Sequence, residues 1–124
     1  MVVVKNVTSL SRSGLSDFVL QRASAAIMAL YTLCVLGFFL ANPELTHAQL
    51  VGYFGSAPML AFSTLLILAT AAHAWIGMWT VGTDYIQAHY FGAHATSFRL
   101  LYQAGCVAVI FLYVVWALQL FWSL

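Results

Sequence analysis

Hydrophobic and polar residues fall in long blocks along this chain. Three blocks are almost entirely apolar, at roughly 23–41, 58–82 and 100–122, and none of them contains Lys, Arg, Asp or Glu. About 20 apolar residues suffice for a helix to cross a bilayer, whereas the strands of a membrane barrel alternate over about 10 residues. The pattern predicts an all-α membrane protein with three transmembrane helices, forming a single membrane domain over 1–124.

Polar residues mark the ends of these blocks. Ser16 and Asp17 precede the first block, where a capping hydroxyl and an acid favour a helix start because they meet free backbone N–H groups. Asn42 and Pro43 end it. The following segment PELTHAQLVGYF, 43–54, has Pro at a first helical position and a spaced apolar face, so we expect a short helix lying in the membrane interface.

Composition supports the membrane assignment. Hydrophobic residues make up 64% of the chain and charged residues 6%, whereas a soluble domain has about 25% charged residues. The net charge of +1 provides no basic patch, which argues against nucleic-acid binding. Cys34 and Cys106 lie in apolar blocks without a metal or redox spacing, so we expect buried, inert thiols.

The basic residues predict an orientation in the membrane. Lys5, Arg12 and Arg22 precede the first block, Arg99 precedes the third, and the connection between the first two blocks has no Lys or Arg. Because basic residues concentrate on the cytoplasmic side, we expect the N-terminus and the second connection to be cytoplasmic. The first connection and the C-terminus are then periplasmic.

A histidine interrupts the second block near its middle. His73 is about nine residues from the cytoplasmic end of the block, roughly 14 Å deep at 1.5 Å per residue. Gly77, Thr80 and Asp84 follow at intervals that keep them within about 40° of its direction. This face of small and polar residues could admit a flat ligand or a closely packed helix.

The chemistry of His73 leaves three interpretations open. A polar residue at membrane depth is a functional candidate, and burial favours the neutral imidazole that ligates metals. Such a ring suits haem iron or a proton relay. It could also be a packing residue, hydrogen-bonded to another helix.

Asp84 and Tyr85 end the second block and also allow two interpretations. They could be an exposed aspartate and an interfacial tyrosine anchor. Alternatively, the phenol could donate a hydrogen bond to a carbonyl of a lipid-soluble ligand, with Asp84 near enough to pass protons.

Three segments carry a resemblance to a known family. HAWIGMWTVGTDY (73–85), SGLSDFVLQRASA (13–25) and GFF (37–39) resemble the small hydrophobic membrane anchor of succinate dehydrogenase, which is respiratory complex II, in its bacterial haem b form. The resemblance spans nearly the whole chain. It implies an anchor of succinate:ubiquinone oxidoreductase in the bacterial inner membrane, serving the respiratory chain and the tricarboxylic acid cycle and not catalytic alone.

The resemblance also implies roles for four residues. His73 matches an axial ligand of haem b iron, and Tyr85 matches a tyrosine that hydrogen-bonds ubiquinone. Asp84 matches an aspartate beside the quinone site, and Arg22 an arginine near the haem propionates. The position of Arg22 at a cytoplasmic helix end would make that charge pairing reasonable.

Partners follow partly from the residues. A haem with two histidine ligands needs both at one depth, and His47 is too far from the level of His73, so the second ligand must come from another chain. The resemblance supplies the larger anchor subunit, cytochrome b556. The chain has no dinucleotide-binding fingerprint and no cysteine framework, so FAD and iron–sulfur clusters belong to a flavoprotein and an iron–sulfur subunit.

Some features stay unassigned. The connection 86–99 is longer than the bacterial pattern. Its His89 and His94 are interpreted as surface residues; alternatively, they contact the soluble subunits or help proton uptake. Two rival functions remain: an anchor whose His73 only packs, and a small proton or solute transporter with a relay through His73, Thr80 and Asp84. Broken helices are typical of transporters, and the blocks give little sign of them.

Overall fold

The computed structural model describes residues 14–124, so Lys5 and Arg12 lie outside the described residues. The described part is helical. Its elements are α2 (Gly14–Ala41), α3 (His47–Gly55), α4 (Ala57–Tyr85), α5 (Ala88–Phe91), the 3₁₀ turn η1 (Gly92–His94) and α6 (Ala95–Trp122).

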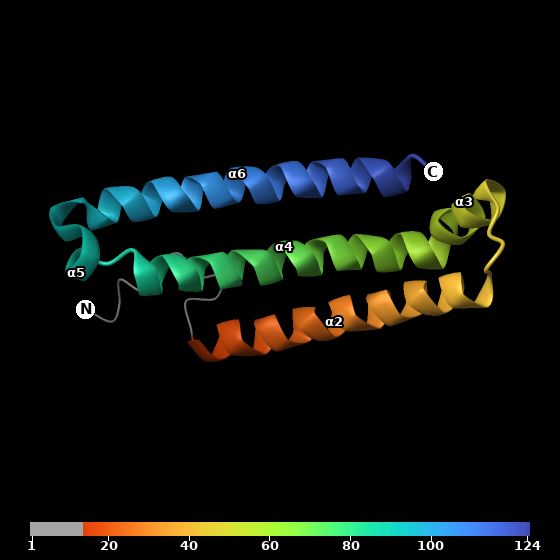
Figure 1. Ribbon diagram of the computed structural model, residues 1–124, viewed down its shortest axis with the longest axis horizontal. Helices are drawn as coiled ribbons and strands as arrows, with labels where there is room; N and C mark the ends of the chain where they lie inside the picture. Colours follow the sequence, from red (N-terminus) through yellow and green to blue (C-terminus); the bar gives the residue numbers. More distant parts are fainter. Residues whose placement is uncertain (1–13) are drawn as a thin grey trace.

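The three long helices lie side by side in one layer (Figure 1). The middle helix is α4, with α2 along one flank and α6 along the other, and each helix runs antiparallel to its neighbour. All three are long and apolar enough to cross a membrane. The prediction of an all-α protein with three transmembrane helices is therefore confirmed.

The helices extend beyond the apolar blocks that predicted them. The 28 residues of α2 measure about 42 Å at 1.5 Å per residue, which matches a bilayer with its headgroup regions rather than the hydrocarbon core alone. As a consequence, Ser16 lies inside the first turn instead of capping it, and Arg22 lies within α2 instead of before it. Asp17 is in the first turn, as expected.

The short helix α3 forms, but it begins at His47 and not at Pro43. The reason is a capping box at Thr46. The Gln49 backbone N–H donates to Thr46 Oγ1 over 3.2 Å, and the Thr46 backbone N–H donates to Gln49 Oε1 over 3.0 Å. Two N–H groups that a helix start leaves unpaired are satisfied in this way.

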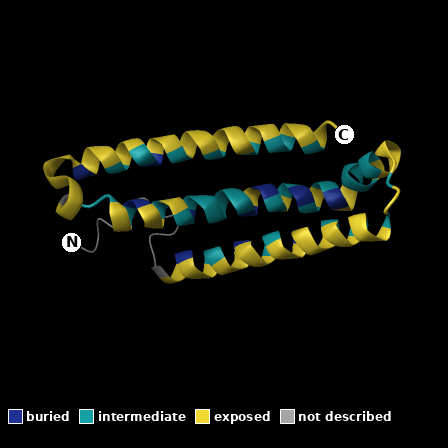
Figure 2. Ribbon diagram, in the orientation of Figure 1, coloured by how far each residue is buried: buried dark blue, intermediate teal, exposed yellow. Residues whose placement is uncertain are grey.

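Most side chains on the outer helices are exposed, and buried residues gather on α4 (Figure 2). In a bilayer, exposed leucine and valine meet lipid tails of the same polarity, so the hydrophobic effect does not drive these helices together. Packing and hydrogen bonds between helices must hold the layer instead.

Side-chain hydrogen bonds join α4 to both neighbours. The hydroxyls of Tyr31 in α2 and Ser63 in α4 are both buried and lie 2.7 Å apart. On the other flank, Trp122 Nε1 at the end of α6 donates to Thr64 Oγ1 over 3.0 Å. Since a bilayer core has no water to satisfy the buried hydroxyls of Tyr31 and Ser63, their bond in particular favours the observed pairing of α2 with α4.

Close contact between α4 and α6 depends on a glycine. A Cβ atom at Gly82 would lie 2.9 Å from Tyr102 Cε2, closer than such atoms approach without a shift. The Tyr102 hydroxyl donates to the Met78 carbonyl over 3.0 Å, which holds the ring in place. Gly82 therefore lets the two helices approach at this level.

The expectation of buried cysteines is wrong for Cys34, which is exposed, whereas Cys106 is half-buried. The Tyr53 hydroxyl lies 3.1 Å from Cys34 Sγ, and its ring stacks on Phe38 with centroids 3.8 Å apart. These contacts connect α3 to α2. The hydrogen bond with Cys34, followed by burial, raises the pKa of Tyr53 to about 12.

Candidate functional site

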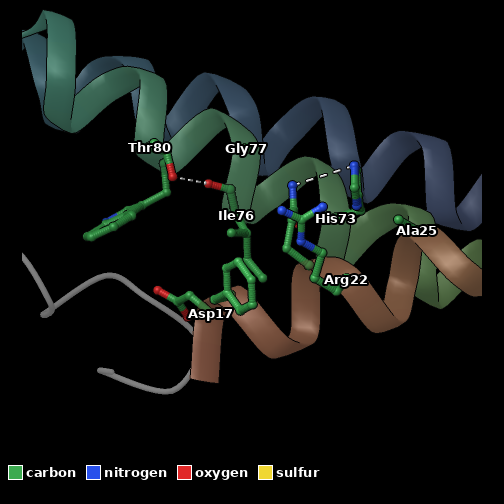
Figure 3. Close-up of a pocket in the computed structure, with 10 residues that line it drawn as sticks. Asp17, Arg22, Ala25, His73, Ile76, Gly77 and Thr80 are labelled. Carbon is green, nitrogen blue, oxygen red and sulfur yellow. Dashed lines mark hydrogen bonds between the residues drawn. The ribbon is translucent and has the colours of Figure 1, made fainter. Parts of the chain in front are cut away.

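A groove of about 510 Å³ lies between α2 and α4. In Figure 3, Asp17, Arg22 and Ala25 reach it from α2, and His73 and Thr80 from α4. Its full lining is Asp17, Phe18, Gln21, Arg22, Ala25, His73, Ile76, Gly77, Trp79 and Thr80.

His73 occupies the middle of α4, which is unbroken from there to Tyr85. The two residues are about 18 Å apart along the helix axis. Gly77 and Thr80 share the groove with the half-buried His73, as the predicted face of small and polar residues requires. Asp84 lies beyond the groove and is exposed.

Both nitrogens of the His73 ring face polar groups of α2. Nδ1 lies 3.1 Å from Ser24 Oγ, so the imidazole does hydrogen-bond across helices, as the packing interpretation predicts. Nε2 lies 3.5 Å from the Gln21 side-chain nitrogen. The second distance exceeds that of a good hydrogen bond, so Nε2 is the less firmly held nitrogen.

Gln21 leaves part of its amide unpaired. Its Oε1 is buried and has no hydrogen-bond partner among the described residues. A Cβ at Gly77 would lie 3.8 Å from the Gln21 Nε2 atom, so the glycine keeps this part of the groove open. Because unpaired polar atoms are costly away from water, Gln21 gains little from its present position.

Arg22 provides a positive charge in the same groove. Its guanidinium carbon lies 4.9 Å from the centroid of the Phe18 ring. The side chain is exposed and can therefore reach an anionic group that enters between the helices. A guanidinium pairs well with carboxylates.

The Asp84–Tyr85 pair forms a second candidate site, at the C-terminal end of α4. Both side chains are exposed, Tyr85 by 68%. The Gln87 amide donates to the carbonyls of Thr83 and Asp84 over 3.0 and 2.9 Å, which satisfies groups that a helix end leaves unpaired. The backbone beneath Tyr85 is therefore held while its phenol remains accessible.

The other histidines lie away from His73. His47 begins α3 at one end of the layer, while His89 in α5 and His94 in η1 lie past the other end of α4 (Figure 1). The rings of His89 and His94 contact Tyr90 and Phe98, respectively. Among the described residues, none of these three lines the groove.

Sequence reasoning missed Ser24 and Gln21 as neighbours of His73. A signal was present, since both are polar residues three apart near the start of the first helix, a spacing that places them on one helical face. Which face meets α4 follows only from the packing of the helices.

Three helices long and apolar enough to cross a membrane define an integral membrane protein, with a groove that contains an imidazole and an accessible Asp-Tyr pair at the end of α4. The chain belongs to the succinate dehydrogenase/fumarate reductase transmembrane subunit family, whose model matches residues 4–115. It is a multi-pass membrane anchor subunit of that family, and the resemblance inferred from sequence is confirmed.

One relative is similar over most of its length. The chain is 30% identical over 112 residues to the succinate dehydrogenase hydrophobic membrane anchor subunit of Coxiella burnetii (strain RSA 493 / Nine Mile phase I). The match covers 90% of this chain and 91% of the relative.

Proposed function

We propose that this chain anchors succinate:ubiquinone oxidoreductase in the bacterial inner membrane. It shares a haem b with a larger cytochrome b556 anchor subunit and contributes Tyr85 and Asp84 to the site of ubiquinone reduction. Succinate oxidation, FAD and the iron–sulfur clusters belong to a flavoprotein and an iron–sulfur subunit. The anchor thus links the tricarboxylic acid cycle to the respiratory chain without being catalytic alone.

The observation that supports this most is the position of His73 in the groove. The ring offers Nε2 beside a residue without a side chain, Gly77, and its Nδ1 is already engaged. Neutral imidazole is the form that binds iron, and small neighbours leave room for a flat ring. The donor type and the shape of the surroundings fit haem b.

When bound, haem b supplies a one-electron carrier. His73 would hold the iron through Nε2, and Arg22 would pair with a propionate because its exposed guanidinium lines the same groove. Gln21 must move aside, and its 3.5 Å contact is weak enough to permit that.

A second histidine ligand would come from the partner anchor subunit. Within 14–124, the other histidines lie on elements at the two ends of α4, whereas both ligands of one iron must lie at one depth. Two chains that each provide a ligand in this way would associate more strongly when the haem is bound.

Ubiquinone binds at the second candidate site, the Asp84–Tyr85 end of α4. Tyr85 donates a hydrogen bond to a quinone carbonyl, and Asp84 beside it exchanges protons with water. Arg22 and Arg99 lie toward this end of the layer, so the positive-inside rule makes it cytoplasmic. A quinone arrives there from lipid while protons arrive from the aqueous side.

Purification of the complex in mild detergent through a tag on this chain tests the proposal. We expect a flavoprotein, an iron–sulfur protein and a second hydrophobic subunit to co-purify, with the absorption bands of a b-type haem on reduction. The rival is a purely structural anchor, supported by the hydrogen bond of His73 to Ser24. It requires the same subunits without those bands.

A further inference from the structure

We infer that Ser24 is the positioning residue for His73: its hydroxyl oxygen accepts the Nδ1–H bond and thereby holds Nε2 as the lone-pair nitrogen facing the groove. The inference rests on the proposed haem role of His73 and extends it to a residue of the neighbouring helix. It concerns the orientation and donor strength of the ligand, not contact with substrate.

The direction of the hydrogen bonds follows from the two contacts of Ser24. Its hydroxyl donates to the backbone carbonyl of Gln21 over 3.0 Å. A hydroxyl has one proton to donate and two lone pairs to accept with. Its oxygen can therefore accept from His73 Nδ1 at 3.1 Å, which places the ring proton on Nδ1 and leaves the lone pair on Nε2.

The surroundings make this bond effective. Ser24 is only 2% exposed and lies on α2, whose packing against α4 is also held by the Tyr31–Ser63 contact. Away from water, hydrogen bonds meet no competition from solvent and are electrostatically stronger. The ring of His73 is thus fixed in rotation by a group on a different helix.

Gln21 differs from Ser24 in the strength of its contact. Its nitrogen is 3.5 Å from His73 Nε2, and its Oε1 lacks a partner among the described residues. If iron takes the place of Gln21 at His73 Nε2, only a long, weak contact is lost. The Ser24 contact is with the other ring nitrogen, Nδ1, and remains. Ser24 therefore acts in the haem-bound protein, and Gln21 gives way.

A hydrogen-bond partner on the ring nitrogen that does not bind the metal has measurable effects on a metal site. It fixes ring orientation and increases ligand basicity, and losing it typically weakens metal affinity about 10- to 100-fold. A more basic ligand favours the ferric state. Loss of the Ser24 hydroxyl should therefore raise the haem midpoint potential, shift its low-spin electron paramagnetic resonance signal, and accelerate haem loss.

The experiment compares Ser24→Ala with Ser63→Ala in the purified complex. Both substitutions remove a buried α2–α4 hydroxyl contact, but Ser63 bonds Tyr31 and not His73. We expect Ser24→Ala to raise the midpoint potential and speed haem loss about 10-fold, while Ser63→Ala leaves both values near those of the native complex. Equal changes in the two variants would assign the effect to helix packing and overturn the inference.

A second pair of variants tests the role of the Ser24 hydroxyl even if the complex with Ser24→Ala does not assemble. Ser24→Thr and Ser24→Val add the same bulk, and only the threonine keeps the hydroxyl. We expect the threonine variant to retain the native potential and resonance signal and the valine variant to lose them; identical spectra in the pair would contradict the inference. A native complex without b-type absorption would remove the proposed function and the inference with it, whereas unchanged haem in Ser24→Ala would remove the inference alone.

Discussion

The side chain of Arg99 holds the carbonyl of Ile86 with two nitrogens, Nε at 3.2 Å and Nη2 at 2.6 Å. Ile86 follows the last residue of α4, and Arg99 lies near the start of α6. A cation at a helix C-terminus also interacts favourably with the helix dipole. The third spanning helix thus fixes the end of α4 that carries Asp84 and Tyr85.

Arg99→Met should loosen that end. Loss of charged hydrogen bonds costs about 1–3 kcal/mol, so we expect faster hydrogen exchange of the amides over 83–86 and a higher KM for ubiquinone. Arg99→Lys keeps the charge but not the paired donors, so its exchange rate and its KM should lie between those of Arg99→Met and the native protein. Unchanged exchange in Arg99→Met would exclude this role.

Tyr85→Phe should lower ubiquinone reduction while dye-linked succinate oxidation stays near the native rate. Removing one hydrogen bond of about 0.5–1.5 kcal/mol corresponds to a loss of up to about tenfold in kcat/KM. Tyr90→Phe is the matched control, because Tyr90 has a similar exposure of 65% against 68% but lies outside α4. Equal losses in the two variants would exclude a specific role for Tyr85.

His73→Leu should alter or abolish the b-type absorption of the complex, because leucine offers no lone pair to iron. His89→Leu is the control, since His89 lies in α5, away from the groove. Absorption spectra of the reduced and oxidised complexes provide the measurement. A native spectrum in His73→Leu would disprove the ligand assignment.

Gly82→Ala should destabilise the contact between α4 and α6. The new methyl group would lie 2.9 Å from the Tyr102 ring, and crowding of this kind costs about 1–3 kcal/mol, partly offset by the better helix propensity of alanine. Thermal unfolding of the complex in detergent measures the effect.

Gly37→Ala is the control for this prediction. A Cβ at Gly37 meets nothing within 4 Å, so the substitution should be neutral or stabilise the helix by up to about 1 kcal/mol. If both glycine variants unfolded at the same temperature, the close approach at Gly82 would not matter for stability.

Hydropathy predicted which segments form the spanning helices, because the bilayer selects apolar runs of a given length. It did not predict their ends. Residues 14–20 are helical although they precede the predicted span, since a helix can continue into the polar headgroup region. Two signals for the start of α3 were present, Pro43 and the capping box at Thr46. The helix begins after Thr46, because the capping box satisfies the first backbone N–H groups.

The site was predictable in part. The spacing of His73, Gly77 and Thr80 is fixed by helical geometry, and the structure places all three on one groove. The contacts of Ser24 with His73 and of Arg99 with Ile86 could not be predicted, because each depends on how neighbouring segments pack. Hydropathy and periodicity describe one helix at a time and carry no such information.

A single layer of helices has no interior of its own. The ring of His73 and the unpaired oxygen of Gln21 lie in a groove between two adjacent helices, and no further spanning helix of the described chain covers them. A solitary copy would leave the exposed Arg22 and the half-buried His73 of this groove facing lipid, at a cost in free energy. If a partner subunit covers this groove, as proposed, the amount of this chain that persists in the cell should follow the supply of that partner.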